Sequence, residues 1–157
     1  MPIIRVETEI NAPIQICFDL SRSVEVHKHS MFHTNEEAIA GKTYGLMEDG
    51  EFVTWQAYHF GVTQFLTSKV YNFNPPFAFR DSQTKGIFNH FHHDHFLEVK
   101  NGKTVLIDEL NYEAPLGFLG KLADVIFLKK YMTNLILKRN EFIKEIAESE
   151  KWKVYIK

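Results

Sequence analysis

The chain has one cysteine among its 157 residues, which excludes an intramolecular disulfide and a zinc site built from several cysteines. This residue, Cys17, stands between Ile16 and Phe18. A reactive thiol needs an accessible and electropositive setting, which these apolar neighbours do not offer. We therefore expect a buried and unreactive thiol.

An excess of charge of one sign is also lacking. The 18 Lys and Arg residues nearly balance the 20 Asp and Glu residues. The sequence shows no basic stripe of the kind that nucleic-acid-binding proteins carry, so we expect no nucleic-acid partner. No apolar run approaches the roughly 20 residues that cross a bilayer. The first residues lead at once into acidic ones, unlike a signal peptide, so we expect a cytoplasmic protein without a membrane span.

What the chain has in quantity is phenylalanine, with 14 residues. Phe is stiff and wholly apolar, and it fills a dense core or lines an apolar pocket equally well. The length fits one domain that buries roughly 70% of its unfolded surface, which leaves room for both a core and a pocket. Composition alone leaves these two uses of Phe open.

The pair Asn101-Gly102 predicts a two-residue hairpin turn, because both residue types accept the positive φ values that such a turn requires. Alternation of polar and apolar residues predicts strands on both sides of this turn and earlier in the chain. The expected strands cover residues 3–10, 35–42, 51–60, 62–73, 77–84, 88–99 and 104–112.

Two short helices are expected after the first strand. Asn11 is the expected N-cap of the first, with Pro13 in its first turn, and Ser21 or Ser23 is expected to cap the second. Residues 117–149 predict a long helix of about 45 Å, which should lie diagonally across one face of the sheet.

The buried side of the long helix is predicted by apolar residues at spacings of three and four. Arg139 interrupts this pattern, and we expect its side chain to run along the edge with its charge in water rather than to reach into a pocket. The apolar positions are Leu122, Val125, Leu128, Met132, Leu135, Phe142 and Ile146.

A set of motifs is typical of one superfamily. The set consists of Asn11-Ala12-Pro13 before a helix with Phe18, Gly50-Glu51, Val53-Thr54-Trp55, His59-Phe60-Gly61, Phe79, Asp81, Gln83, Gly86, Phe88, Phe91, His93, His95, Gly102, Thr104, Asp108, Tyr112, Pro115-Leu116-Gly117 and Leu119-Gly120. With these residues, positions 1–148 resemble the START/Bet v1-like (SRPBCC) superfamily, and more closely the bacterial ligand-binding SRPBCC proteins related by name to polyketide cyclases.

This resemblance implies an α+β helix-grip fold. In it, a curved seven-stranded antiparallel sheet, two short helices and a long C-terminal helix enclose an apolar cavity. The domain would cover residues 1–149, followed by a tail at 150–157 that is either frayed or an added strand. The superfamily hosts binding proteins, transporters, cyclases and hydrolases on one scaffold, so the resemblance implies no particular ligand.

The strand at 88–99 carries four histidines. Side chains alternate along a strand, so His90 and His92 share one face, which we expect in water. The other face is expected to line the cavity, and it carries Asn89, Phe91, His93, His95 and Leu97.

Two histidines at this spacing can hold one metal ion if Asp81, Asp108 or His59 supplies a third ligand. The alternative is a pair of hydrogen-bonded cavity histidines, and we expect this alternative, with no metal and no cofactor. A second use is a general base, in which His93 or His95 is oriented by Asp108 or Asp81. His93 and Asp108 are therefore the candidate catalytic residues, although a buried carboxylate also needs a partner for purely structural reasons.

We expect a protein that binds a small, mainly hydrophobic molecule, lipid-like or aromatic and polyketide-like, without acting on it. The alternatives are a cyclase- or dehydratase-type enzyme that uses a His–Asp base, and a module that binds a partner through the final helix or the tail. The oligomeric state stays open. The expected ligand-binding residues are Trp55, Ala57, His59, Phe79, Asp81, Phe91, His93, His95, Asp108, Tyr112, Met132 and Ile136.

Overall fold

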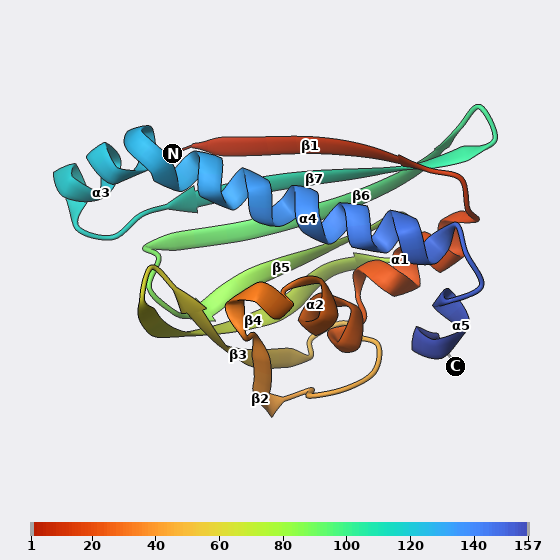
Figure 1. The fold of residues 1–157 in the computed structure, drawn as a ribbon, viewed down its shortest axis with the longest axis horizontal. Coiled ribbons are helices and arrows are strands. Elements are labelled where there is room, and N and C mark those ends of the chain that lie inside the picture. The colour runs from red at the N-terminus through yellow and green to blue at the C-terminus, as the bar shows by residue number, and fades with distance from the viewer. Residues whose placement is uncertain (1, 157) are drawn as a thin grey trace.

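The computed structural model describes residues 2–156 and contains one antiparallel sheet of seven strands (Figure 1). The strands are β1 (Ile3–Ile10), β2 (Glu37–Gly41), β3 (Phe52–His59), β4 (Val62–Asn74), β5 (Ala78–Lys85), β6 (His90–Lys100) and β7 (Lys103–Glu113). Their order in the sheet is β1-β7-β6-β5-β4-β3-β2, so β1 and β2 are the edges. The expected strands are confirmed, with ends that differ by at most two residues.

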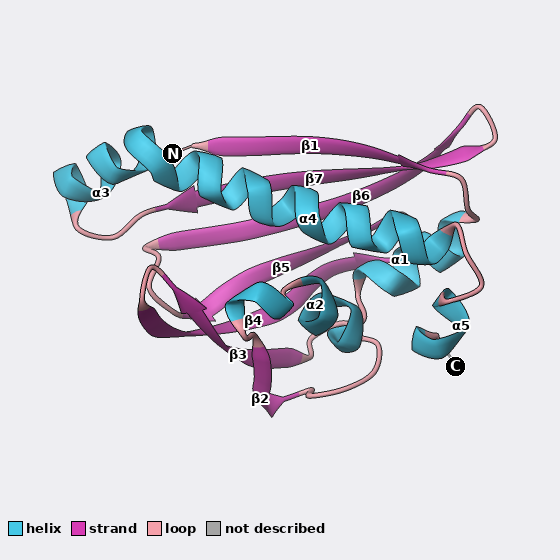
Figure 2. Ribbon diagram, viewed as in Figure 1, coloured by secondary structure: helices cyan, strands magenta, loops and turns pink. Residues whose placement is uncertain are grey.

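The helices lie together on one face of the sheet (Figure 2). They are α1 (Ile14–Ser21), α2 (Val24–Ser30), the 3-10 turn η1 (Phe32–Thr34), α3 (Gly117–Ala123), the π-helical segment η2 (Asp124–Leu128), α4 (Lys129–Ala147) and α5 (Trp152–Tyr155). From α3 to α4 the chain is one continuous helical rod, and α4 runs across the sheet (Figure 1). This is the expected helix-grip arrangement. Within residues 2–156, no helix is long and apolar enough to span a membrane.

The hairpin between β6 and β7 has the predicted turn. Asn101 and Gly102 have φ values of 52° and 76°, as a two-residue turn requires. The turn fixes a continuous register, from Lys100 opposite Lys103 to His90 opposite Glu113.

The cap of the second helix is as predicted, while that of the first is not. The hydroxyl oxygen of Ser23 accepts a hydrogen bond from the Val26 N–H at 3.2 Å, which caps α2. Asn11 does not cap α1, because that helix begins at Ile14 and Pro13 occupies the N-cap position.

The predicted buried side of the long helix is correct only in its second half. Leu122 and Val125 are exposed, and no residue of η2 is buried. The physical reason is that the start of the helical rod, at α3, extends past the ends of the strands, so its outward side chains have no sheet beneath them (Figure 1). The buried residues of α4 are Ile136, Arg139, Asn140, Ile143, Ile146 and Ala147. The expectation that Arg139 lies in water was therefore wrong.

The main core lies between α1, the C-terminal half of α4 and the sheet. Phe18 and Ile143 are fully buried there, together with Cys17. Burial raises the pKa of the Cys17 thiol to about 11, which leaves it protonated and unreactive at neutral pH. Trp152 and Tyr155 of α5 pack against this core, so the tail forms a short helix rather than a frayed end or a strand.

The turn gives a direct test of the fold. Gly102→Ala should lower the free energy of unfolding by about 1 kcal/mol, because a Cβ is disfavoured at positive φ. No atom lies within 4 Å of a Cβ built on Gly102, so backbone strain is the whole effect. Asn101→Gly should be nearly neutral. Urea denaturation measures both variants, and equal stability of the two would contradict this account.

Candidate functional site

A cavity of about 300 Å³ lies between the sheet and α4. Trp55 and Phe79 come from the sheet, and Met132 and Ile136 come from the helix that faces it. Most of the wall is apolar because the inward positions of β3 and the facing positions of α4 carry aliphatic and aromatic side chains. The helix is held at its C-terminal half by the main core, while Leu128, Met132 and Ile136 pack toward β1 and β7. The cavity lies between this part of the helix and strands β3 to β6.

Ten of the twelve expected ligand-binding residues line the cavity. They are Trp55, Ala57, His59, Phe79, Asp81, Phe91, His93, His95, Met132 and Ile136. Two lie elsewhere. Asp108 is fully buried behind the histidines. Tyr112 is also fully buried, and its hydroxyl donates to Asp124 at the start of η2, so it ties the helical rod to β7.

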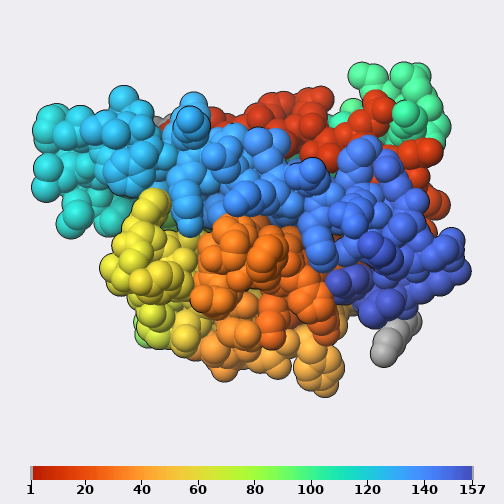
Figure 3. All heavy atoms as spheres, in the orientation of Figure 1, coloured from red at the N-terminus to blue at the C-terminus, as the bar shows by residue number. Residues whose placement is uncertain are grey.

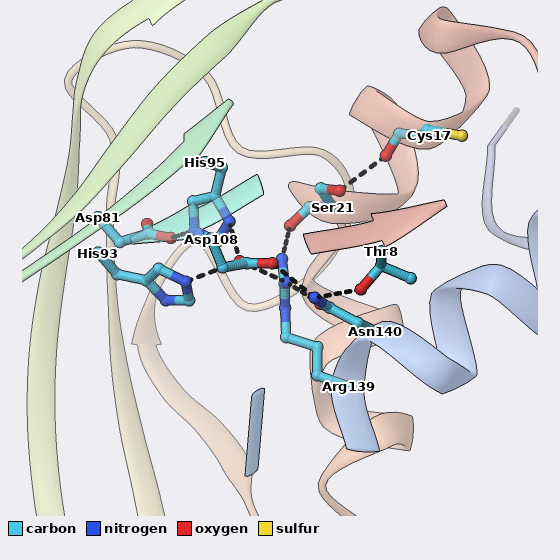
Figure 4. A network of polar contacts seen from close by, with 9 residues as sticks. All are labelled: Thr8, Cys17, Ser21, Asp81, His93, His95, Asp108, Arg139 and Asn140. Carbon is cyan, nitrogen blue, oxygen red and sulfur yellow. Dashed lines mark hydrogen bonds and ion pairs between the residues drawn. The ribbon is translucent and has the colours of Figure 1, made fainter. Parts of the chain in front are cut away.

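Five side chains form what we call the polar cluster: Asp81, His93, His95, Asp108 and Arg139 (Figure 4). All of them except Asp108, which lies behind the histidines, line the cavity. Strand register brings its first four members together, because Asp81 lies opposite His93 on β5 and β6, and His95 lies opposite Asp108 on β6 and β7.

The histidines bridge the two carboxylates. His93 Nε2 lies 2.8 Å from Asp108 Oδ1. His95 Nε2 lies 3.0 Å from Asp81 Oδ2, and its Nδ1 lies 3.1 Å from Asp108 Oδ1. His95 therefore stands between two acids, while His93 contacts one acid and forms part of the cavity wall.

Arg139 completes the cluster from α4. Its Nη1 lies 3.4 Å from Asp108 Oδ1, and its Nη2 donates to the Ser21 carbonyl oxygen at 2.8 Å. Asn140 donates to the other carboxylate oxygen of Asp108 at 2.6 Å. A buried carboxylate must be partnered, and this one has partners on β6 and α4 (Figure 4). The sequence did not predict that Arg139 and Asn140 bind Asp108, because these contacts depend on where α4 lies against β7.

The cluster sets the charge of each member. Burial alone would raise the pKa of Asp108, but the hydrogen bonds from His93 and His95 outweigh it and hold that pKa well below its usual range. Burial likewise raises the pKa of Asp81, and the hydrogen bond from His95 lowers it by more. Two carboxylates are thus ionised at neutral pH.

The two histidines respond in opposite directions. Burial and then repulsion from His95 lower the pKa of His93 to about 4. Burial also opposes charge on His95, but the hydrogen bonds to Asp108 and Asp81 prevail and raise its pKa. The raised pKa favours the protonated form of His95, which together with Arg139 opposes the charges of Asp81 and Asp108, while His93 remains neutral.

Neutral His93 offers a hydrogen-bond acceptor. Its Nε2 carries the proton, because a carboxylate accepts there. Its Nδ1 therefore has a free lone pair, and no residue in the described range 2–156 is hydrogen-bonded to that atom. This nitrogen is the polar atom that the cluster leaves available to a ligand hydroxyl or N–H.

Three of these groups can also be considered as metal ligands. The ligating atoms of His93, His95 and Asp108 lie within 4.8 Å of one another, so the third ligand that the sequence left unassigned is Asp108. However, Asp108 already accepts hydrogen bonds from His93 and Asn140, and the Arg139 cation lies beside it. These groups already form an ion-pair network with Arg139, in which Asp108 is the shared partner.

The cavity wall carries a second polar pair, between β3 and α4. His59 Nδ1 lies 2.6 Å from the Tyr131 hydroxyl, and burial lowers the pKa of His59. Tyr131 also lines the cavity but was not predicted. The signal was present, since Tyr131 lies four residues before Leu135 and so shares its helix face.

Comparison with known proteins concerns the fold. No protein-family model matches the chain, and no curated protein is similar to it in sequence. Among solved structures, TTHA0849 from Thermus thermophilus is 17% identical over 93% of this chain and 97% of that one, with a TM-score of 0.76. The ginseng major latex-like protein 151 from Panax ginseng is 12% identical over 94% and 98%, with a TM-score of 0.69.

A third solved structure is the di-domain ARO/CYC StfQ from the steffimycin biosynthetic pathway. It is 10% identical over 93% of this chain and 50% of that one, with a TM-score of 0.75. This chain therefore spans about half of StfQ, and the likeness at this identity is a likeness of fold.

The charge assignment predicts the titration of individual histidines. His93 should stay neutral down to about pH 4, whereas His95 should stay protonated above pH 6.5. NMR chemical shifts of the ring nitrogens and carbons report the protonation of both histidines. Measurement from about pH 3.5 to about pH 9 spans the ordinary and the lowered histidine pKa. Titration of His93 near pH 6.5 would contradict the assignment.

The same shift predicts how stability depends on pH. Between pH 6.5 and about 4 the unfolded chain binds a proton at His93 that the folded chain does not, so stability falls on acidification through this window. The loss is on the order of 3 kcal/mol. His93→Gln keeps a donor for Asp108 but does not titrate, so it should show a shallower fall. Urea denaturation at neutral pH and near the lower end of this window measures the difference, and identical slopes would contradict the prediction.

Proposed function

We propose that this chain, which has the Bet v1-like (SRPBCC) helix-grip fold, binds a small and mainly hydrophobic molecule in the cavity between the sheet and α4. The observation that carries the proposal is the cavity itself, which has a mostly apolar wall and one polar cluster. Ligand sites in proteins typically combine such a wall with a few polar groups that fix orientation.

The size of the cavity narrows the ligand class. About 300 Å³ is at the lower end of the range for small-molecule sites. A compact aromatic molecule or a short-chain lipid suits this volume. Burial of its apolar surface supplies the binding free energy, at about 25 cal/mol per Å² removed from water.

The polar cluster supplies orientation. Because the charges of Asp81, His95, Asp108 and Arg139 balance within the protein, the cluster does not demand a charged ligand. His93 Nδ1 instead accepts a hydrogen bond from one donor group of the ligand. A phenol or alcohol group placed at His93, with its apolar body against Trp55 and Met132, satisfies both requirements.

The alternative is a cyclase- or dehydratase-type enzyme. The His93–Asp108 pair favours it, because a carboxylate that orients a histidine is the arrangement of a general base. StfQ, which has the same fold, is described as an ARO/CYC of a biosynthetic pathway. The pKa of His93 opposes it, since a base that holds its proton only below about pH 4 is weak at neutral pH. This contrast favours binding without turnover.

A cavity-filling variant tests the proposal. Ala57 lines the cavity from β3, so Ala57→Phe should fill it and weaken binding at least tenfold while the protein stays folded. Gln56→Phe adds the same ring at the next position on the strand, which does not line the cavity, and should bind like the parent. Dye displacement by short-chain fatty acids and by hydroxylated aromatics measures the affinity.

Two outcomes would count against the proposal. One is a parent protein that binds none of these molecules, and the other is equal affinity of both variants. Mass spectrometry of the recovered ligand distinguishes the alternative function. We expect the mass of the ligand to be unchanged. A loss of water from the ligand, at a rate that His93→Gln abolishes, would establish the enzyme.

A further inference from the structure

Seven exposed large apolar side chains lie on one short stretch of the helical rod, which we call the apolar segment (residues 116–128). Phe118 is 78% exposed and Val125 is 84% exposed. Such a concentration of apolar surface in one place commonly marks an interaction site. The exposed members are Leu116, Phe118, Leu119, Leu122, Val125, Ile126 and Phe127.

The apolar segment is helical and is anchored to the rest of the protein, so its apolar side chains are held in exposed positions. The Tyr112 hydroxyl donates to Asp124, which fixes η2 to the end of β7. Gly120 lies directly against the main chain of Pro115, where a Cβ would come within 1.9 Å of the carbonyl oxygen. The segment is therefore presented as a projecting helical end (Figure 1).

The segment adjoins the mouth of the cavity. Phe60 and Ile87 are both exposed and line the cavity, which identifies them as its rim. The ring of Phe60 lies 5.4 Å from that of Phe127 and 4.6 Å from that of Tyr131. In Figure 3 the atoms of the β3–β4 turn lie directly beside those of the helical end. The apolar surface thus continues from the segment into the cavity.

Lysines outnumber acidic residues along this surface. Lys121, Lys129 and Lys130 are exposed, and none of them forms an ion pair within residues 2–156. Asp124 is the one acid between residues 116 and 131, and its carboxylate accepts a hydrogen bond from the Tyr112 hydroxyl, so three lysines stand against one acid. The protein as a whole has a net charge of −2, so this positive patch is a local feature.

We propose that the apolar segment docks on the surface of an anionic phospholipid bilayer, with Phe118 and Val125 among the acyl chains and the lysines at the headgroups. An apolar helical face flanked by lysines is the pattern of interfacial membrane binding. The inference rests on the proposed function and deepens it, since it makes the bilayer the source or destination of the ligand. A second copy of the chain fits less well, because a two-fold contact would bring both sets of lysines together.

Vesicle binding tests the docking. Vesicles of phosphatidylcholine with phosphatidylglycerol should retain the protein at least tenfold better than phosphatidylcholine alone. Lys129→Ala and Lys130→Ala should each weaken this binding about fivefold, from about 1 kcal/mol for each lysine near the surface. Val125→Glu should abolish it. Val99→Glu is the matched control, since Val99 is 63% exposed near the far hairpin, and it should bind like the parent.

Insertion has its own readout. The Phe118→Trp variant should show a blue shift in emission on anionic vesicles and none on neutral ones. Equal binding to both vesicle types, or equal behaviour of Val125→Glu and Val99→Glu, would overturn the inference. So would a dimer in solution that Val125→Glu dissociates, together with no binding to vesicles.

Uptake of an apolar dye without vesicles separates this inference from the proposed function. Parent protein and surface variants should all take up the dye equally, because none of these substitutions lines the cavity. If the parent takes up the dye but ignores anionic vesicles, the docking alone fails. If the parent takes up no dye, the proposed function fails, and the bilayer then has no ligand to supply or receive.

Discussion

The structure depends on one buried charge, that of Asp108. A carboxylate without solvent is stable only with close partners, and removal of one partner from a buried pair typically costs about 3–5 kcal/mol. Asp108 has His93 and His95 on the neighbouring strand and Arg139 and Asn140 on α4. These contacts join β6 and β7 to two adjacent residues of α4, which fixes where the helix lies on the sheet.

This position of α4 on the sheet explains both the cavity and the exposure of the apolar segment. Beyond Arg139, toward the C-terminus, the helix packs tightly against α1 and the sheet through Ile143 and Ile146. In the other direction Ile136 and Met132 pack toward β1 and β7 and line the cavity, and the rod then extends past the ends of the strands (Figure 1). The internal apolar cavity and the external apolar surface are then two parts of one geometry, joined where Phe60 of the rim contacts Phe127.

Much of this could be predicted from local sequence. Alternation gave the strands and put His93 and His95 on the inward face. The two-residue turn at Asn101-Gly102 even determines that Asp108 lies opposite His95, because each step away from the turn pairs one residue on either side. The partner of His95 on β5 could not be counted in this way, since a longer loop precedes β6. The burial of Arg139 and the exposure of Val125 depend on where the helix meets the sheet, which no local pattern encodes.

A crystal structure of the protein with a bound hydroxylated aromatic molecule tests the central claim most directly. The account predicts ligand density between Trp55 and Met132, with a hydroxyl oxygen about 3 Å from His93 Nδ1 and with Arg139 still paired to Asp108. A hollow closed by movement of α4 onto the sheet, or a ligand bound only at the outer surface, would contradict it.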